Sequence, residues 1–329
     1  NGLVQLDDQL NIQPDIAKSW RINDSTSTYT FTLRDDVYFH KNKVFKKDST
    51  RSVVAQDFVY SFDRLLSPEL ASPGSWVFNA VQRYHAANDS TLVIQLNKPF
   101  PAFLGLLSMR YCSVVPKEAI AFYGNDFRSN PVGTGPFRFK FWEENVKLVL
   151  RKNPMYFEKD TQGNRLPYLE AVAITFLPDK QSEFLQFAQG NIDFMTGLDN
   201  SYKDEIITTK GTLQPKYKDR VQLITTPYLN TEYLGFFMGS TTNEIASPLI
   251  RQAINYGFDR KKMVKYLRNG IGTPAINGFI PSGLPSFNNM EGYTYKPEIA
   301  REFIEAYRKQ TGLINPSITI TTNSNYLDL

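Results

Sequence analysis

The 329-residue sequence predicts an α/β protein built from two or three domains. Its length exceeds the ~100–200 residues of a usual single domain. Strand and helix patterns alternate along the chain, as they do where helices pack on a sheet. The stretch from Ser247 to Val264 adds a third observation, because it predicts two helices joined at a sharp corner.

The first third of the chain contains two strand patterns and an amphipathic helix. Residues 28–33 alternate polar and apolar side chains, which is the period of a half-buried strand. Residues 53–66 repeat apolar side chains at helical spacing, so one face of a helix is expected to be buried there. Residues 92–96 predict a second strand, and a short apolar helix is expected at residues 102–107.

The middle third opens with a turn that includes Gly133-Thr134-Gly135. This segment lacks the spacing of a phosphate-binding loop, so a tight structural turn is the better interpretation. Three apolar segments predict strands: residues 147–151, 171–176 and 221–225. A helix is expected at residues 179–189, beginning at Asp179 and ending before Gly190.

The last third opens with the helix corner. Pro248 suits a first helical turn, and Gly257 is expected to end that helix in the left-handed conformation. Asp259 is expected to cap the second helix of the corner. A further helix at residues 297–308 and a strand at residues 318–321 follow.

The amino-acid composition excludes several classes of protein. The formal net charge of +4 is small for this length and both signs are interspersed, so no nucleic-acid partner is expected. The single cysteine, Cys112, excludes an intrachain disulfide and is expected to be buried. No run of about 20 apolar residues predicts a membrane span. The chain starts at Asn1 and not at a methionine, so we expect it to be processed or trimmed, without its signal segment.

The sequence contains no recognisable catalytic or metal-binding constellation. His40, at the end of a strand pattern, and His85, in a polar run, have no nucleophile elbow beside them, so neither predicts a hydrolase triad. With two histidines and one cysteine, a zinc site is not expected. We therefore expect no enzyme activity, no catalytic residue, no metal site and no cofactor.

An aromatic cluster surrounds residues 230–232, formed by Tyr228, Tyr233, Phe236 and Phe237. If this segment is a strand, Tyr233 and Phe237 share one face. Aromatic walls with a few polar groups are typical of a concave binding site, but a core strand fits the same pattern.

Ten motifs occur in one order along nearly the whole chain, at residues 1–4, 14–20, 29–34, 37–40, 57–64, 131–137, 151–157, 190–193, 248–264 and 297–307. They include Pro131-Val-Gly-Thr-Gly-Pro-Phe137 and the corner with Arg251-Gln-Ala and Asp259-Arg. In this order they resemble family 5, the peptide- and nickel-type extracellular solute-binding proteins, including the dipeptide- and oligopeptide-binding components of ABC importers. The sequence departs from the family pattern at three positions: Lys41-Asn42 replaces its usual Asp-Gly, and Val54 replaces a capping threonine.

The resemblance implies a two-lobed periplasmic-binding-protein fold, type II-like, with the extra small subdomain of the peptide-binding class. Residues 1–127 would form that small α/β subdomain of the first lobe, and residues 128–240 its main α/β part. Residues 241–329 would begin a second lobe that is incomplete, so the chain is expected to be truncated at both ends. Ligand-anchoring residues of peptide-binding relatives would lie beyond Leu329.

The resemblance also implies that the protein captures a solute, most simply a peptide, by hinged closure of two lobes without chemistry. Its partners would be that peptide or another small solute and the ABC permease subunits, with the protein itself a monomer. Its location would be periplasmic, or extracytoplasmic and membrane-anchored as a lipoprotein. The alternative is a solute-sensing domain of a regulator with the same fold, which a DNA-binding module elsewhere in the gene would favour.

Three segments are candidate ligand contacts by this resemblance. Residues 109–113 resemble a strand that faces the cleft, residues 230–237 resemble the strand leading to the interlobe crossover, and residues 323–326 resemble a loop that opens onto the ligand. The predicted contacts are Arg110, Tyr111, Asn230, Tyr233, Phe237, Asn323, Asn325 and Tyr326.

Overall fold

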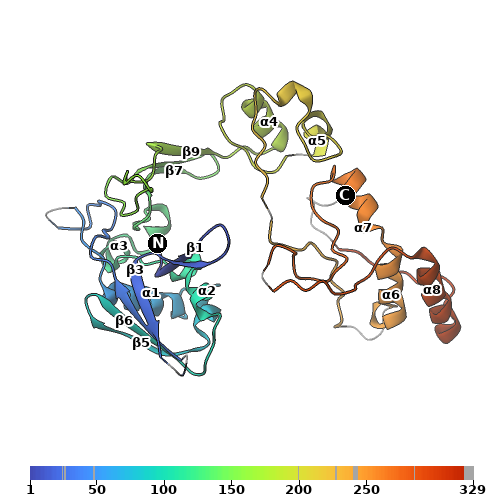
Figure 1. Cartoon of the computed structure of the whole chain (residues 1–329), viewed down its shortest axis with the longest axis horizontal. Helices are drawn as coiled ribbons and strands as arrows, with labels where there is room; N and C mark the ends of the chain where they lie inside the picture. Colours follow the sequence, from blue (N-terminus) through green and yellow to red (C-terminus); the bar gives the residue numbers. More distant parts are fainter. Residues whose placement is uncertain are drawn as a thin grey trace. The chain divides into compact units, whose positions relative to one another are not determined.

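The chain divides into two compact units, Asn1–Pro178 and Asp179–Leu329. The first is coloured from blue to green in Figure 1, and the second from yellow to red. The computed structural model describes residues 1–23, 25, 27–46, 49–198, 200–226, 228–239, 244–284 and 286–321, excluding the side chains of residues 200 and 201. The boundary after Pro178 lies inside the range 128–240. The three-part division given above stays a prediction.

The first unit is organised around a four-stranded antiparallel sheet with strand order β3-β4-β6-β5. Its strands are β3 (Ala17–Ile22), β4 (Thr28–Leu33), β5 (Val81–Asn88) and β6 (Thr91–Leu96). In β4 the apolar side chains Tyr29, Phe31 and Leu33 are buried while the threonines between them are half-buried. The alternation seen in the sequence therefore corresponds to the two faces of this sheet.

Two smaller antiparallel sheets complete the strands of this unit. One pairs β1 (Val4–Leu6) with β2 (Ile12–Pro14), and the other has the order β7-β8-β9. Its strands are β7 (Phe137–Glu143), β8 (Lys147–Lys152) and β9 (Ala171–Thr175). The predicted strands at residues 28–33, 92–96, 147–151 and 171–176 are confirmed within one residue of their bounds.

The first unit also contains helices and helical turns. They are α1 (Ala55–Leu66), η1 (Ser75–Phe78), α2 (Phe103–Leu107), η2 (Arg110–Cys112), α3 (Lys117–Tyr123) and η3 (Gly124–Ser129). The α1 helix lies beside β5 and β6 (Figure 1). It buries Phe58 and Phe62, as its sequence period predicts. Phe62 is fully buried against Phe78 and Tyr84, with ring centroids 4.5 and 5.4 Å away.

A partly buried ion cluster links the start of α1 to α3. The guanidinium of Arg51 donates two 2.7 Å hydrogen bonds to Asp57 and bonds of 2.7 and 2.8 Å to Glu118. The same group lies 5.0 Å from the ring centroid of Phe39. Asp57 also accepts a 2.9 Å bond from the backbone N–H of Val54, which is the half of a capping box that the third helical residue supplies; Val54 has no side-chain oxygen to supply the other half.

The second unit is helical in its described part. Its elements are α4 (Lys180–Ala188), α5 (Asn200–Ile206), η4 (Pro215–Tyr217), η5 (Glu244–Ala246), α6 (Pro248–Gly257), α7 (Arg260–Lys262), the π-helical turn η6 (Met263–Leu267) and α8 (Pro297–Thr311). Asp179 caps α4 by accepting a 2.7 Å bond from the Ser182 backbone N–H, as predicted. The α6 and α8 helices pack against each other.

The predicted helix corner is present, but Gly257 plays a different part in it. Asp259 caps α7 as expected, accepting from the Lys262 backbone N–H at 2.9 Å. Gly257 is the last residue of α6 and has no left-handed conformation; the chain leaves the helix through an extended Phe258. A Cβ at position 257 would lie 3.6 Å from the Ala300 Cβ, so this glycine lies at ordinary contact distance from α8.

Three predicted strands are wrong in the structure as described. Residues 221–225, 230–237 and 318–321 carry strand patterns but belong to no sheet. A strand is stable only when its backbone bonds to a neighbour, and none of the described segments supplies one here. No helix within the described ranges is long and apolar enough to cross a membrane.

Candidate functional site

Arg110 and Tyr111 lie in the first unit on η2, a single 3₁₀ turn between α2 and α3. The predicted strand at residues 109–113 is therefore wrong, although Met109 and Ser113 on either side are extended. The side chains of Arg110 and Tyr111 are exposed, with 43% of Tyr111 open to solvent. The structure thus presents both predicted contacts at the surface.

The backbone beneath these two side chains is firmly held. Cys112 is 1% exposed, and its N–H bonds to the Met109 carbonyl at 2.9 Å. The N–H of Val114 donates to the Asn1 carbonyl at 3.0 Å, and this bond links the residues after the turn to the first residue of the chain, just before β1. Burial raises the pKa of the Cys112 thiol to about 12, so this cysteine is an inert core side chain as predicted.

The second predicted group, Asn230, Tyr233 and Phe237, lies in the second unit on a segment without helix or strand. All three side chains are exposed, Tyr233 by 70% and Phe237 by 76%. Beside them, Glu232 pairs with Arg268 at 2.6 Å. The Thr231 hydroxyl donates a 2.7 Å bond to the Phe279 carbonyl. These two side chains connect the segment to other parts of the second unit.

Phe279 is an aromatic neighbour that the sequence analysis missed. Its ring lies edge-on to that of Tyr233, with centroids 4.9 Å apart, and 63% of it is exposed. The two positions are far apart in sequence, and Phe279 lies in a stretch with no helix or strand period, so nothing local predicts the pair. An exposed aromatic pair of this kind can hold an apolar or planar group of a small molecule.

The remaining predicted contacts, Asn323, Asn325 and Tyr326, lie outside the described residues. They stay predictions.

A hollow of about 580 Å³ in the first unit has several charged groups in its lining. Arg34 donates two 2.8 Å bonds to Asp36, and its guanidinium lies 4.9 Å from the Phe157 ring centroid. Asp15 is buried and accepts bonds from Asn1 and the Gly2 backbone N–H. No predicted ligand contact lines this hollow.

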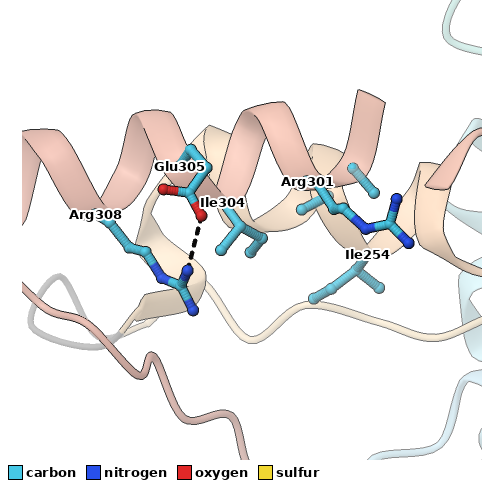
Figure 2. A pocket seen from close by; sticks show the side chains of 7 residues that line it. Ile254, Arg301, Ile304, Glu305 and Arg308 are labelled. Atoms are coloured by element: carbon cyan, nitrogen blue, oxygen red, sulfur yellow. Dashed lines mark hydrogen bonds and ion pairs between the residues drawn. The ribbon is translucent and has the colours of Figure 1, made fainter. Parts of the chain in front are cut away.

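A second hollow, of about 550 Å³, lies between α6 and α8. Figure 2 shows Ile254 and Ile304 along it, with Arg301 and Arg308 at opposite ends in this view. Glu305 pairs with Arg308 at 2.7 Å. No predicted ligand contact lines this hollow.

Neither a metal-binding cluster nor a catalytic role for His40 is indicated by the side chains that the structure describes. Within those ranges, no group of three or more His, Cys, Asp or Glu side chains is arranged to hold a metal ion. His40 is buried: its Nε2 lies 2.9 Å from the Gly135 carbonyl oxygen and its Nδ1 accepts from the Gly133 N–H. His85 lies within β5. The Gly133–Gly135 turn thus binds a histidine and no phosphate is needed to explain it.

The sequence profile of the bacterial extracellular solute-binding proteins, family 5, matches residues 11–328. The chain belongs to this family. The resemblance inferred from the ordered motifs is therefore confirmed. A family 5 chain is a solute-binding protein, so the expectation of a binding protein in place of an enzyme is confirmed at the level of the family.

Relatives of this family 5 chain are named for different ligands. It is 29% identical over 311 residues to heme-binding protein A of Haemophilus influenzae, covering 89% of this chain and 53% of that protein. It is 24% identical over 304 residues to the glutathione-binding protein GsiB of Salmonella typhi, covering 92% and 54%. The chain spans about half the length of these relatives.

Solved structures confirm the periplasmic-binding-protein fold. The chain matches the periplasmic binding protein DppA of Helicobacter pylori, solved with the peptide STSA, at 26% identity and a TM-score of 0.73; the match covers 96% of this chain and 60% of that one. It matches NikZ of Campylobacter jejuni, solved with Ni(L-His), at 23% identity and a TM-score of 0.68, covering 93% and 57%. The second likeness supports the fold alone.

Proposed function

We propose that this protein is the extracytoplasmic solute-binding component of an ABC importer and that its solute is a peptide. The observation that carries the proposal is the likeness to DppA of Helicobacter pylori, which was solved with a bound peptide and matches nearly the whole chain. Capture would proceed by hinged closure of two lobes, because a ligand that touches both stabilises the closed state.

The proposed contacts are those that the sequence indicated. Arg110 and Tyr111 in the first unit, and Asn230, Tyr233 and Phe237 in the second, are all exposed. Arg110 has no ion pair or hydrogen bond of its side chain within the described ranges, so its guanidinium is available to an anionic group such as a peptide carboxylate. Asn323, Asn325 and Tyr326 complete the proposed set.

The proposal extends to partners, location and domain division. The permease subunits of the importer would recognise the closed monomer, either free in the periplasm or anchored by a lipid outside the membrane. The first lobe would divide into residues 1–127 and 128–240, and residues 241–329 would belong to the second lobe. Limited proteolysis of the full-length protein tests this division, because cleavage concentrates at exposed boundaries.

Calorimetric titration of the full-length protein tests the function directly. We expect saturable binding to a mixed peptide library. We expect weaker or no binding to glutathione, heme and Ni(L-His), the ligands for which similar proteins are named or with which they were solved. Tyr111→Ala should weaken peptide binding. Tyr168→Ala is the matched control, since Tyr168 is a 68% exposed tyrosine of the same unit outside the proposed contacts.

Two outcomes would contradict the proposal. No binding of any peptide, with binding of one of the other three ligands, would replace the solute class and keep the family function. Binding of none of them by a folded full-length protein would remove the solute-binding proposal itself.

A further inference from the structure

We infer that Gly74 is a positioning residue that holds the Tyr111 ring as a platform for a planar group of the solute. The inference rests on the proposed function, because it deepens the role of Tyr111 in the proposed site. It concerns the first unit alone, where both residues lie.

The Tyr111 ring lies directly against the backbone of Gly74. An ideal Cβ at position 74 would lie 2.2 Å from Cγ, 2.4 Å from Cδ1 and 2.7 Å from Cβ of Tyr111. Real Cβ atoms do not approach other heavy atoms this closely. Even an alanine at this position would therefore push the tyrosine side chain away.

Space, and not backbone conformation, is what requires glycine here. Gly74 has φ −93° and ψ −1°, which any L-residue can adopt. A glycine needed for a turn would instead have a positive φ. The contact with Tyr111 is thus the feature that distinguishes glycine from alanine at this position.

Both sides of this contact are anchored in the core. The Gly74 N–H bonds to the Ser72 hydroxyl at 3.3 Å, and its carbonyl accepts from the N–H of Val77, which is 1% exposed. On the other side, Tyr111 is followed by the buried Cys112. The ring is therefore fixed from behind while 43% of the side chain remains open to solvent.

The exposed ring and its neighbour indicate the chemical class of the solute group. Aromatic rings bind other planar groups by offset or edge contacts worth about 0.5–1.5 kcal/mol, which is about a 2- to 12-fold change in affinity. The adjacent Arg110 disfavours a cation, since its charge is not neutralised by any described side chain. The platform thus suits a planar group without positive charge, and among peptide side chains the planar aromatic ones are those of Phe, Tyr and Trp.

A double-mutant cycle on the full-length protein separates positioning from general structure. The probes are the tripeptides Ala-Ala-Ala, Phe-Ala-Ala, Ala-Phe-Ala and Ala-Ala-Phe, measured by calorimetry against wild type, Gly74→Ala, Tyr111→Ala and the double variant. We expect one phenylalanine peptide to bind better than Ala-Ala-Ala, and Gly74→Ala to reduce that preference about 2- to 12-fold. In the Tyr111→Ala background, Gly74→Ala should have no further effect.

Gly105→Ala is the matched control, because a Cβ there would meet nothing within 4 Å. It should leave the preference unchanged. Tyr111→Ser supplies a second variant should Gly74→Ala fail to fold: it should also lose the preference for phenylalanine.

The outcomes separate this inference from the proposed function. Peptide binding without any preference for a planar side chain, or equal losses from Gly74→Ala with and without Tyr111, would overturn the role of Gly74 and leave the function standing. Retention of the preference in Tyr111→Ser would do the same. A wild-type protein that binds no peptide would overturn both.

Discussion

The two units of this chain bury their apolar side chains to very different extents. In the first, a continuous core packs the sheet of β3, β4, β6 and β5 against α1, and its largest members are fully buried. In the described part of the second, the buried apolar side chains are Phe184, Ile207, Ile250, Ala253 and Tyr307. Many large apolar side chains there are exposed instead, including Phe194, Tyr233, Phe237 and Phe279.

This difference shows that a strand pattern in the sequence forms a strand only where a neighbouring strand pairs with it. Residues 28–33 and residues 221–225 both carry apolar strand patterns, but β4 lies between two neighbours and the second segment pairs with none of the described residues. Backbone N–H and C=O groups need partners, and a sheet supplies them only where a second strand is adjacent. Exposed backbone and exposed aromatic side chains therefore occur together in the second unit.

Hydrogen exchange on the 329-residue chain gives the largest expected contrast. Amides of β4 and β6 should exchange only through global unfolding, whose free energy for a native domain is about 5–15 kcal/mol. Within the described part, amides of residues 222–226 and 231–238 donate no backbone hydrogen bond, so they should exchange at nearly the rate of an unfolded chain. The helical amides of α8 serve as the internal control of the second unit. If residues 231–238 were protected as strongly as β4, the contrast between the paired backbone of the first unit and the unpaired backbone of the second would be wrong.

A matched pair of phenylalanine truncations measures the same contrast in side chains. Phe62→Ala should lower the free energy of unfolding by about 3–5 kcal/mol, because Phe62 is fully buried among Phe78 and Tyr84. Phe194→Ala should change it by about 0.5 kcal/mol or less, since 66% of that side chain is already exposed. Urea denaturation followed by circular dichroism measures both. A similar cost for the two would contradict the burial of the second unit as described.

The sequence predicted those parts of the fold that local patterns determine. The helix face of α1, the caps at Asp179 and Asp259 and the alternation in β4 all follow from spacing within one segment. The misses depend on distant partners. Gly257 ends α6 without a left-handed turn, beside Ala300 of α8, which no local rule reveals.

The candidate site follows the same division. Exposure of Arg110 and Tyr111 agrees with their predicted role, and their part in ligand binding stays a prediction. The contacts of Tyr111 with Gly74 and of Tyr233 with Phe279 could not be predicted, because each joins positions distant in the chain without a sequence period linking them.

Two arginine ion pairs, one in each unit, allow the same comparison through the free energy lost when each pair is broken. Arg51→Met should cost about 3 kcal/mol, the low end for a buried pair, because it leaves the 5% exposed Asp57 carboxylate without its cation while Arg51 itself is partly exposed. Arg268→Met breaks the pair with Glu232, whose side chain is 55% exposed, and should cost about 0–1 kcal/mol. Thermal and urea unfolding of both variants check this. Equal losses of unfolding free energy in the two variants would mean that the Arg51 cluster is no better shielded from water than the Arg268–Glu232 pair.

The smallest effect is the pH dependence that His40 gives to the first unit. Burial lowers the pKa of His40 below its ordinary 6.5, and the neutral ring uses both nitrogens, one beside the Gly135 carbonyl and one accepting from Gly133. Below about pH 6.5 the unfolded chain therefore binds a proton that the folded chain does not. The free energy of unfolding should fall as pH is lowered from 6.5 toward the folded pKa, by at most about 1.4 kcal/mol per pH unit.

His40→Gln isolates this contribution. A glutamine amide can still donate to the Gly135 carbonyl but does not titrate, so the difference between wild type and variant should grow less favourable to wild type as pH falls from 6.5. Urea denaturation at several pH values between 5 and 8 measures the difference, and the common titration of other groups cancels in it. A difference independent of pH would show that His40 titrates alike in the folded and unfolded chains, and that the Gly133–Gly135 turn does not hold it neutral.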